Sequence, residues 1–367
     1  MIKSCYVHVP FCKKICSYCD FCKNFYNPKI VSKYLEELSN EIKYNYDGEV
    51  LKTLYVGGGT PSCLSFFELN KLFSALKMLK LEKDYEFTFE CNYEDITESL
   101  LKLLKASRVN RISIGVQSFN KKYEKLLERP LSKEDITSKV SLAKRYFRNV
   151  NVDLMYGFPE QSIKDLYKDV LEFLKLDVNH ISTYALMIEP NTKLGVRKVL
   201  PLSDDKQAKM YEVIVNTLKE KGYKHYEISN FAKDEFYSLH NLTYWNNEEY
   251  YGFGAGASGF VNKLRYDNTK SVVNYIKGSK IVSEEMVSKT QMMMDEVMLG
   301  LRKVSGINKR QFFKKYEISF EEAFNVNDLI NLGLLLSNDK FVWIPEDKLF
   351  ISNEVILRVL DNYRLNK

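Results

Sequence analysis

The chain has 367 residues, which is enough for one large domain and a smaller one. Its hydrophobic content of 45% and charged content of 28% are typical of a soluble globular protein. The net charge of +6 is small for this length, and no block of Lys and Arg stands out, which argues against a dedicated nucleic-acid binder. No apolar stretch is long enough to cross a membrane and the N-terminus lacks a signal-peptide layout, so we expect a cytoplasmic protein.

Strand-like apolar runs alternate with helical segments through the first half of the chain. This alternation favours a parallel sheet with helices outside it. The strand–helix units are too few for a full barrel, so we predict an α/β fold with a partial (βα)6 barrel. The six predicted strands are Cys5–Val9, Thr53–Val56, Glu86–Cys91, Arg111–Val116, Val150–Tyr156 and His180–Met187.

The helices between these strands carry start signals. The pattern S-x-x-E that begins at Ser65 is a capping box, in which the two side chains satisfy backbone N–H groups of the first turn. Ser132 and Ser162 each precede a helical segment in the same way. Ser203 starts a further helix, which we expect Gly222 to end.

The pattern changes after about residue 230. Residues 237–260 are rich in aromatic residues, Asn and Gly. Beyond them we predict helices over Gln291–Leu301 and Lys309–Lys315 and a short strand-like end over Lys340–Ile351, which indicate a small helical, winged-helix-like domain. Its simplest role is to cover the open barrel. The predicted parts are a core domain of residues 1–233, a connecting segment of residues 234–283 and a C-terminal domain of residues 284–367.

Four of the seven cysteines lie between residues 12 and 22, a spacing that suits a metal or cluster site in a reducing compartment. Cys12, Cys16 and Cys19 form C-x3-C-x2-C just after the first strand. Three thiolates can bind three irons of a [4Fe-4S] cluster and leave the fourth iron open to the amino and carboxylate groups of S-adenosylmethionine (SAM). The alternatives add Cys22, as a structural zinc site or as a closed four-cysteine cluster for electron transfer.

The remaining cysteines do not extend this group. Cys5, Cys63 and Cys91 fall in strand or loop patterns, where we expect each to be a small buried hydrophobic residue.

Polar residues and a glycine run follow the later strands. The run G-G-G-T-P comes after Val56, and glycines at a strand end let a ligand approach the backbone closely, although the run alone could be an ordinary tight turn. It lacks the spacing of dinucleotide-binding and P-loop motifs, so phosphate binding is disfavoured. Glu90, Gln117, Arg129 and Asp153 end or follow further strands. Together they offer acceptors for ribose hydroxyls and ammonium, and a cation for a carboxylate, which are the groups that SAM presents.

A second motif, H-N-L-T-Y-W, begins at His240 and precedes a Gly/Ala-rich segment, G-F-G-A-G-A-S-G. We expect His240 to lie in a loop among aromatic residues. Its imidazole could ligate a haem iron, with Tyr244 and Trp245 stacking on the macrocycle. The alternative is a histidine that anchors a packed aromatic corner.

These motifs together resemble those of radical SAM proteins in the oxygen-independent coproporphyrinogen III oxidase group, and within it the haem chaperone branch, HemW. The resemblance spans nearly the whole chain and rests on Y-V-H-V-P-F-C-x3-C-x2-C-D-F, G-G-G-T-P, R-I-S-I-G-V-Q-S-F, D-L-M-Y-G-F-P, Y-E-I-S-N-F-A, H-N-L-T-Y-W and G-F-G-A-G-A. It implies a [4Fe-4S] cluster, SAM and haem as cofactors, and a HemN-type C-terminal domain. The implied SAM-contacting residues are Tyr6, Tyr18, Gly58, Gly59, Thr60, Glu90, Gln117, Arg129, Asp153 and Ala185.

Several features separate the chaperone branch from the oxidase. The oxidase type has a cysteine two residues after the third cluster ligand, where this chain has Phe21, and a long extension before the cysteine loop. The H-N-x-x-Y-W signature of the chaperone branch is intact. The branch often has His in the Gly/Ala-rich segment, where this chain has Ser258. The residues around Arg129 also differ from the usual sequence of the family.

We therefore predict a haem chaperone that binds haem and a SAM-bound cluster and transfers haem to acceptor proteins. The alternative is a radical SAM enzyme, specifically an oxygen-independent coproporphyrinogen III oxidase, in which a 5′-deoxyadenosyl radical abstracts hydrogen from the substrate. SAM cleavage is within the range of the family, whereas coproporphyrinogen oxidase activity is not expected. The expected partners are haem and haem-accepting proteins, with peripheral contact to membrane haem proteins; we expect a monomer or homodimer.

Overall fold

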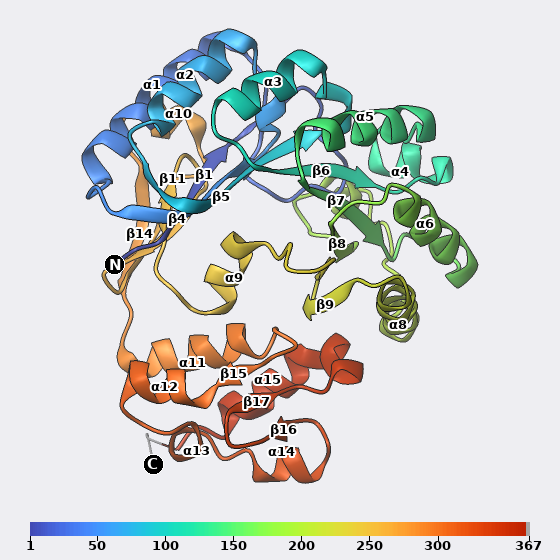
Figure 1. The fold of residues 1–367 in the computed structure, drawn as a ribbon, viewed down its shortest axis with the longest axis vertical. Helices are drawn as coiled ribbons and strands as arrows, with labels where there is room; N and C mark the ends of the chain where they lie inside the picture. Colours follow the sequence, from blue (N-terminus) through green and yellow to red (C-terminus); the bar gives the residue numbers. More distant parts are fainter. Residues whose placement is uncertain (365–367) are drawn as a thin grey trace.

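The computed structural model describes residues 1–364, so the last residues of the predicted C-terminal domain lie outside the described residues (Figure 1). A parallel sheet curls through the upper part of the molecule with helices on its outer side, and the C-terminal elements form a separate group below it (Figure 1). None of the helices within residues 1–364 has the length and apolar character needed to cross a membrane.

The centre of the main sheet is six parallel strands in chain order, as predicted. Their apolar residues are buried because the outward side chains pack under helices and the inward ones fill the barrel. The strands are β1 (Ser4–Val9), β4 (Val50–Gly58), β5 (Lys80–Asn92), β6 (Arg111–Gln117), β7 (Asn149–Tyr156) and β8 (His180–Ala185). The last strand ends two residues before its predicted end at Met187.

The outer helices are α1 (Pro28–Asn45), α2 (Phe66–Leu76), α3 (Glu98–Ala106), α5 (Lys133–Tyr146), α6 (Ile163–Lys175) and α8 (Asp204–Glu220), with short helices α4 (Glu124–Leu127) and α7 (Lys193–Val196) between them. The capping box at Ser65 is confirmed, and the side chains of Ser132 and Ser162 also accept N–H groups of the first turn. Ser203 precedes α8 without a side-chain cap. Gly222 follows α8 with φ +82°, a conformation that favours glycine.

The main sheet is wider than predicted. Strand β11 (Tyr251–Phe253) pairs in parallel with β1, and β10 (Asn230–Ala232) and β9 (Lys224–Glu227) extend the opposite edge in antiparallel pairing. A small antiparallel sheet of β12 (Ser258–Val261), β13 (Leu264–Asn268) and β14 (Ile281–Met286) lies beside β11, with α10 (Val272–Ile276) between its last two strands. The predicted boundary at residue 284 falls inside β14.

The predicted loop around His240 is wrong, because these residues form helix α9 (Leu239–Trp245). Ser238 caps the helix by accepting the Asn241 N–H, and Glu86 of β5 accepts the N–H groups of Leu239 and His240. The helix is short and lies between the barrel and the C-terminal elements, so its sequence shows no single apolar stripe that would have predicted a helix.

The C-terminal group combines short helices with a three-stranded antiparallel sheet. Its elements are α11 (Lys289–Gly300), β15 (Ile307–Asn308), α12 (Lys309–Tyr316), α13 (Phe320–Ala323), α14 (Asn327–Asn331), β16 (Leu336–Ser337), β17 (Phe341–Trp343) and α15 (Ser352–Asp361). The two predicted helices are confirmed, but the predicted strand over Lys340–Ile351 is too long. It ends at Trp343, because Pro345 has no N–H for a ladder and begins a 3₁₀ helix (Glu346–Ile351).

The C-terminal group packs against α9 and the nearby strand end of β9. Asn247, just after α9, donates its side-chain amide to the carbonyl of Met292 in α11 at 2.9 Å, and Lys303 donates to the Asn246 side chain. Ile228 N–H donates to the carbonyl of Arg302 at 2.9 Å. Helix α9 is thus held between the barrel and the C-terminal group (Figure 1).

A buried carboxylate joins α1 to the segment after β11. Glu41 is 2% exposed. It accepts the Gly254 N–H at 2.8 Å, the Asn268 side-chain amide at 2.7 Å and the hydroxyl of Tyr275. Burial raises the pKa of the Glu41 carboxyl, and these hydrogen bonds oppose that rise.

Substitution of this carboxylate should destabilise the fold. Glu41→Ala leaves three buried donors without their acceptor, at a cost of about 1–3 kcal/mol each, so we expect a loss of about 3 kcal/mol or more in the free energy of unfolding. Urea denaturation measures this value. The control is Glu36→Ala, which removes a surface ion pair to Lys71 and an exposed hydrogen bond from Ser32, and it should change stability by less than about 1 kcal/mol. Equal effects of the two substitutions would contradict the structural role of Glu41.

Candidate functional site

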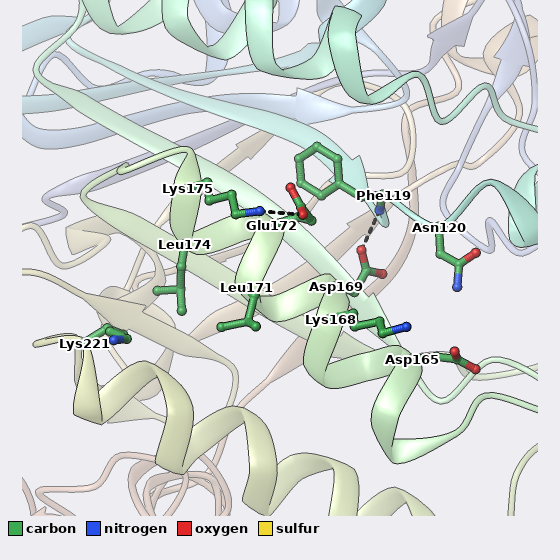
Figure 2. A pocket seen from close by; sticks show the side chains of 10 residues that line it. All are labelled: Phe119, Asn120, Asp165, Lys168, Asp169, Leu171, Glu172, Leu174, Lys175 and Lys221. Carbon is green, nitrogen blue, oxygen red and sulfur yellow. Dashed lines mark hydrogen bonds and ion pairs between the residues drawn. The ribbon is translucent and has the colours of Figure 1, made fainter.

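The outer side of the barrel has a groove of about 690 Å³ between α6 and the chain after β6 (Figure 2). Several of its charged groups are already engaged: Lys175 pairs with Glu172 at 2.7 Å, and Asp169 accepts the N–H of Phe119 at 2.7 Å. None of the predicted site residues lines this groove. They gather instead at the carboxyl ends of the parallel strands.

A cavity of about 420 Å³ opens at these strand ends, and we call it the strand-end cavity. Ligand sites in parallel α/β sheets lie at this edge, because successive strands bring the residues that follow them together there. The predicted residues that line it are Cys12, Cys16, Tyr18, Cys19, Gly58, Gly59, Thr60, Glu90, Gln117, Arg129, Asp153 and Ala185.

The cysteine loop leaves β2 (Phe11–Cys12) and returns at β3 (Asn24–Phe25), and the parallel pairing of these two short strands closes its base. Cys12 is buried, whereas Cys16 and Cys19 are partly exposed. Burial raises the pKa of the Cys12 thiol to about 11. All three cysteines line the strand-end cavity, and three thiolates are the donor set that a [4Fe-4S] cluster requires.

Cys22 lies apart from these three residues. Its thiol donates to the Lys270 carbonyl at 3.2 Å, and its side chain lines a different cavity. Among the residues that the structure describes, no group of three or more His, Cys, Asp or Glu side chains, the cysteines of this loop included, is arranged to hold a metal ion. The position of Cys22 favours three cluster ligands over the zinc and closed-cluster alternatives. Cys5, Cys63 and Cys91 are buried, as predicted.

The glycine run at the end of β4 allows unusually close packing. A Cβ atom on Gly58, which has φ +112°, would lie 2.5 Å from the His8 ring, and one on Gly57 would lie 2.6 Å from the Glu90 carboxyl carbon. The freed space lets Glu90 accept the Gly58 N–H at 3.1 Å and the Tyr55 hydroxyl at 2.7 Å. The turn and the carboxylate of the next strand therefore form one rigid wall.

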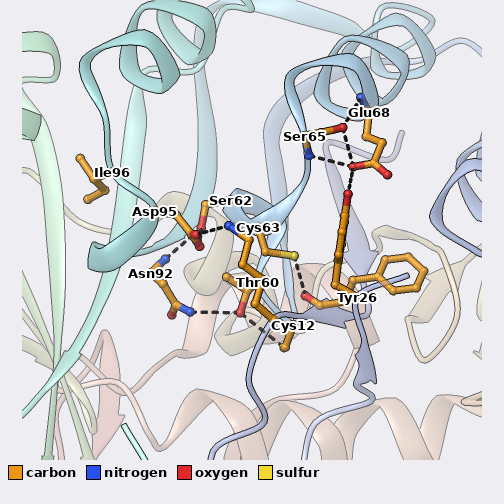
Figure 3. A network of polar contacts seen from close by, with 12 residues as sticks. Cys12, Tyr26, Thr60, Ser62, Cys63, Ser65, Glu68, Asn92, Asp95 and Ile96 are labelled. Atoms are coloured by element: carbon orange, nitrogen blue, oxygen red, sulfur yellow. Dashed lines mark hydrogen bonds and ion pairs between the residues drawn. The ribbon is translucent and has the colours of Figure 1, made fainter. Parts of the chain in front are cut away.

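Thr60 connects this turn to the cysteine loop (Figure 3). Its hydroxyl donates to the Cys12 sulfur at 3.4 Å and accepts from the Asn92 side chain at 3.4 Å. The network continues from the Asn92 N–H to Ser62, and from Ser62 to Asp95. A hydroxyl that donates to sulfur stabilises the thiolate form, which is the form that binds iron.

Two carboxyl groups face the cavity from neighbouring parts of the sheet. Burial raises the pKa of Asp153 to about 7, and the nearby Glu90 charge adds to this effect. Burial likewise raises the pKa of Glu90. Asp153 accepts from the Asn151 amide at 2.8 Å. A ligand that brings hydroxyl or ammonium donors into the cavity would stabilise the ionised form of both carboxyl groups.

Arg129 is the positively charged residue of the strand-end cavity that could pair with a ligand carboxylate. Its guanidinium is 6% exposed, lies 5.7 Å from the centre of the Tyr93 ring and reaches 4.0 Å from the Cys16 sulfur. It also donates to the Gly115 carbonyl, at a bulge where Gln117 adopts φ +72°. The Nε atom of Arg129 has no hydrogen-bond partner. A buried guanidinium with an unused donor fits a ligand carboxylate.

The cavity has further lining residues that strand-end reasoning missed. Asn92 and Ser113 lie on β5 and β6, and Tyr184 and Met187 lie at or after the end of β8. Tyr184 directly precedes the predicted Ala185 and Met187 follows it by two residues, so their place in the chain could have identified them. Asn92 directly follows the predicted strand end at Cys91, so its place in the chain also marked it, whereas its contact with Thr60 could not be seen in the sequence.

Tyr6 does not line the strand-end cavity. Its ring lies on a neighbouring cavity and its hydroxyl lies 2.9 Å from Nδ1 of His8. A contact between Tyr6 and SAM stays a prediction, and the placement of the ring does not support it.

His240 does not line either cavity. It is 1% exposed, with Nδ1 2.8 Å from the Thr53 hydroxyl and Nε2 2.8 Å from the Tyr244 hydroxyl. Burial lowers its pKa to about 3, so the imidazole is neutral. Ligation of haem iron by His240 stays a prediction, and it would require one of these hydrogen bonds to break and α9 to move.

Comparison with protein families defines the class of this fold and site. A profile for the radical SAM superfamily matches residues 6–173, and a profile for the HemN C-terminal domain matches residues 287–347. The protein is a radical SAM protein with a HemN-type C-terminal domain. This class implies a [4Fe-4S] cluster and SAM, which fit the donor set of the strand-end cavity.

Three curated relatives named haem chaperone HemW narrow this class. The relative from Lactococcus lactis is 40% identical and covers 97% of both chains. The one from Bacillus subtilis is 38% identical over 96% of this chain and 98% of its own, and the one from Escherichia coli is 33% identical over 84% and 85%. The chain belongs to the HemW family.

The solved structure of coproporphyrinogen III oxidase (HemN) from Escherichia coli, a radical SAM enzyme, has a TM-score of 0.85. It covers 98% of this chain and 90% of its own, at 20% identity. This similarity confirms the predicted α/β radical SAM fold with its C-terminal domain.

The cysteine arrangement predicts which substitutions remove the cluster. Cys12→Ser, Cys16→Ser and Cys19→Ser should each abolish it, because each removes the ligand of one iron. Cys22→Ser is the matched control and should retain about four irons per chain, because Cys22 lies outside the strand-end cavity. Iron and sulfide assays after anaerobic reconstitution give the answer. Loss of iron in Cys22→Ser would contradict the three-ligand assignment.

Arg129 should set the affinity for SAM. Arg129→Met removes a buried charge-assisted donor worth about 1.5–3 kcal/mol, which corresponds to a loss of about tenfold or more in affinity. Equilibrium dialysis of SAM against the reconstituted protein measures this. Arg197→Met is the control, since Arg197 is exposed and pairs with Glu128 on the surface. Unchanged affinity in Arg129→Met would exclude its role as the carboxylate partner.

Proposed function

We propose that the protein is a haem chaperone, which binds haem, holds a [4Fe-4S] cluster with SAM in the strand-end cavity and transfers haem to acceptor proteins. The observation that carries the proposal is the 40% identity, over 97% of the chain, to a relative named haem chaperone HemW. The intact cysteine wall and the buried Arg129 support the cluster and SAM part of it.

The residues of the strand-end cavity have distinct roles in this proposal. Cys12, Cys16 and Cys19 hold the cluster, which when bound can supply an electron to the sulfonium of SAM. Arg129 pairs with the SAM carboxylate, and its unused Nε donor supports this role. Glu90 and the other strand-end acceptors orient the ribose and ammonium groups.

The proposed partners are haem and haem-accepting proteins, including membrane haem proteins that a cytoplasmic chaperone contacts from the surface. We propose a monomer or homodimer in solution.

A coproporphyrinogen III oxidase is the alternative function. The oxidase pattern places a cysteine where this chain has Phe21, and here Phe21 is an exposed side chain between the two cavities. The identity to HemW relatives also favours the chaperone.

A haem titration of the anaerobically reconstituted protein, followed by absorbance, tests the proposal. We expect about one haem per chain and a loss of about tenfold in affinity in His240→Ala, because the substitution removes the hydrogen-bond partner of Tyr244 in the H-N-x-x-Y-W motif. His180→Ala is the matched control: His180 is equally buried and doubly hydrogen-bonded, but it pairs with Asn151 and Tyr226.

The outcomes separate the two functions. Absence of specific haem binding in the wild-type protein would overturn the chaperone proposal, and conversion of coproporphyrinogen III would establish the oxidase. Equal affinities of His240→Ala and the wild-type protein would exclude a role of His240 in haem binding while leaving the chaperone proposal in place.

A further inference from the structure

Asn151 is a buried amide on β7, one step along the strand from the strand-end cavity. It precedes Asp153 by two residues, so the two side chains lie on the same face of the sheet. Asp153 lines the cavity, whereas Asn151 does not and is only 2% exposed. Asn151 is in register with Ser113 of β6 and His180 of β8, so these three residues form a polar row across neighbouring strands.

The amide of Asn151 uses all four of its hydrogen-bonding positions. Its Nδ2 donates to the Ser113 hydroxyl at 2.8 Å and to Oδ1 of Asp153 at 2.8 Å. Its Oδ1 accepts from Nδ1 of His180 at 2.6 Å and from the Ser182 hydroxyl at 3.1 Å. An asparagine amide offers two donors and two acceptor lone pairs, so none remains free. The side chain is therefore held in one orientation by partners on three strands.

His180 locks this orientation, because its own hydrogen bonds admit only one tautomer. The Asn151 oxygen can only accept, so Nδ1 of His180 carries the hydrogen. Nε2 then accepts from the Tyr226 hydroxyl at 2.7 Å, and the Tyr226 oxygen accepts the Ser238 N–H at 3.1 Å. Burial lowers the pKa of His180 well below its usual range, so the ring is neutral. Every group of this chain meets a complementary partner.

The chain ends at a carboxylate with one oxygen held and one free. Oδ1 of Asp153 accepts the Asn151 amide, and within residues 1–364 no group donates a hydrogen bond to Oδ2. A carboxylate that is held through one oxygen cannot rotate freely, so its other oxygen stays available to a ligand in the strand-end cavity. Hydroxyl and ammonium groups are the donors that this oxygen can accept.

The charged groups around Asp153 come from several elements. Burial and the Glu90 charge raise the pKa of Asp153 to about 7. The hydrogen bond from Asn151 and the positive charges of Arg111 and Arg129 oppose this rise. The Asn151 donor therefore favours the ionised form of a carboxyl group that is balanced between its two forms near neutral pH.

Tyr184 of β8 is the uncharged titratable group on the remaining side. Burial and the Asp153 charge raise the pKa of its hydroxyl, so it stays protonated. It adds no charge that would change with pH in the neutral range.

We propose that Asn151, locked by His180, is a positioning residue that aims the Asp153 carboxylate at the hydroxyl or ammonium donors of SAM. The inference rests on the proposed function in one respect, the role of Asp153 as an acceptor for SAM. Asn151 itself lies outside the cavity and acts only through Asp153.

SAM affinity measured against pH tests this role. Asn151→Ser shortens the side chain, so its hydroxyl no longer reaches Asp153. A hydrogen bond to a charged group shifts a pKa by about one unit or more, so the pKa of Asp153 should rise. Because the ionised carboxylate binds the donors of SAM, affinity falls as the pH falls through this pKa, and a higher pKa moves the loss to higher pH.

The variant should therefore bind SAM about fivefold more weakly than the wild-type protein at neutral pH and within about twofold of it at about pH 8.5. Equilibrium dialysis of the reconstituted protein measures both affinities. Their ratio at each pH cancels the titration of the amino group of SAM. An iron content of about four per chain shows that a variant is folded and holds its cluster.

Two substitutions of His180 test the lock without changing Asn151. His180→Leu removes the Nδ1 donor, which frees the Asn151 amide to turn its oxygen toward Asp153, and should weaken SAM binding with the same pH dependence. His180→Asn keeps an N–H donor near the position of Nδ1 and should restore the wild-type affinity. This pair decides the question if Asn151→Ser fails to take up a cluster.

Two further variants are the controls. Ser182→Ala also removes a partner of Asn151, but His180 still holds the amide oxygen and the bond to Asp153 remains. Ser182 does not line the cavity, so this variant should bind SAM like the wild-type protein at every pH. Asp153→Asn is uncharged at every pH and should weaken binding without recovery at high pH.

The outcomes separate the inference from the proposed function. Wild-type affinity in Asp153→Asn would remove Asp153 from the proposed SAM site, and the inference would fail with it. Weak binding in Asp153→Asn with wild-type affinity in Asn151→Ser and His180→Leu would overturn the inference alone. Equal weakening at every pH would also overturn it, because that is the effect of a purely structural role. Weakening that recovers at high pH, with His180→Asn and Ser182→Ala like the wild type, establishes the positioning role.

Discussion

The hydrogen bonds of the buried Glu90 carboxylate to the Gly58 N–H and the Tyr55 hydroxyl hold together the part of the molecule on which both cavities depend. They are possible because the glycine run has no Cβ atoms between neighbouring strands. From this wall the Thr60 hydroxyl reaches the Cys12 sulfur on one side, and the His8 ring packs against Gly58 on the other. The close approach of the glycine backbone to these side chains thus orients the cysteine loop through Thr60, the Glu90 side of the strand-end cavity, and the His8 ring next to it.

The strand-end residues could be predicted because parallel strands deliver the residues that follow them to one edge of the sheet. Glu90, Gln117 and Asp153 come from three different strands and meet around one cavity for this reason alone. Tyr6 departs from this rule because it lies in the middle of β1, where its ring lines the neighbouring cavity and its hydroxyl lies 2.9 Å from Nδ1 of His8. Here side-chain direction decides, and a sequence pattern gives only the strand.

The helix around His240 and the extra strand β11 could not be predicted from local pattern. Both depend on partners far away in the sequence: β11 pairs with β1, and Glu86 accepts the N–H groups at the start of α9. The same holds for the end of the chain, where β17 is short and α15 follows it to pack on the C-terminal group. Tertiary contacts overrule local propensity in such short elements.

The segment Asp20–Phe21 is shared by both cavities, and this has a thermodynamic consequence. A ligand that fixes this segment from one side also sets the shape of the wall on the other side. By linkage, any change that SAM causes in the affinity for a ligand of the neighbouring cavity must be matched by an equal change in the affinity for SAM.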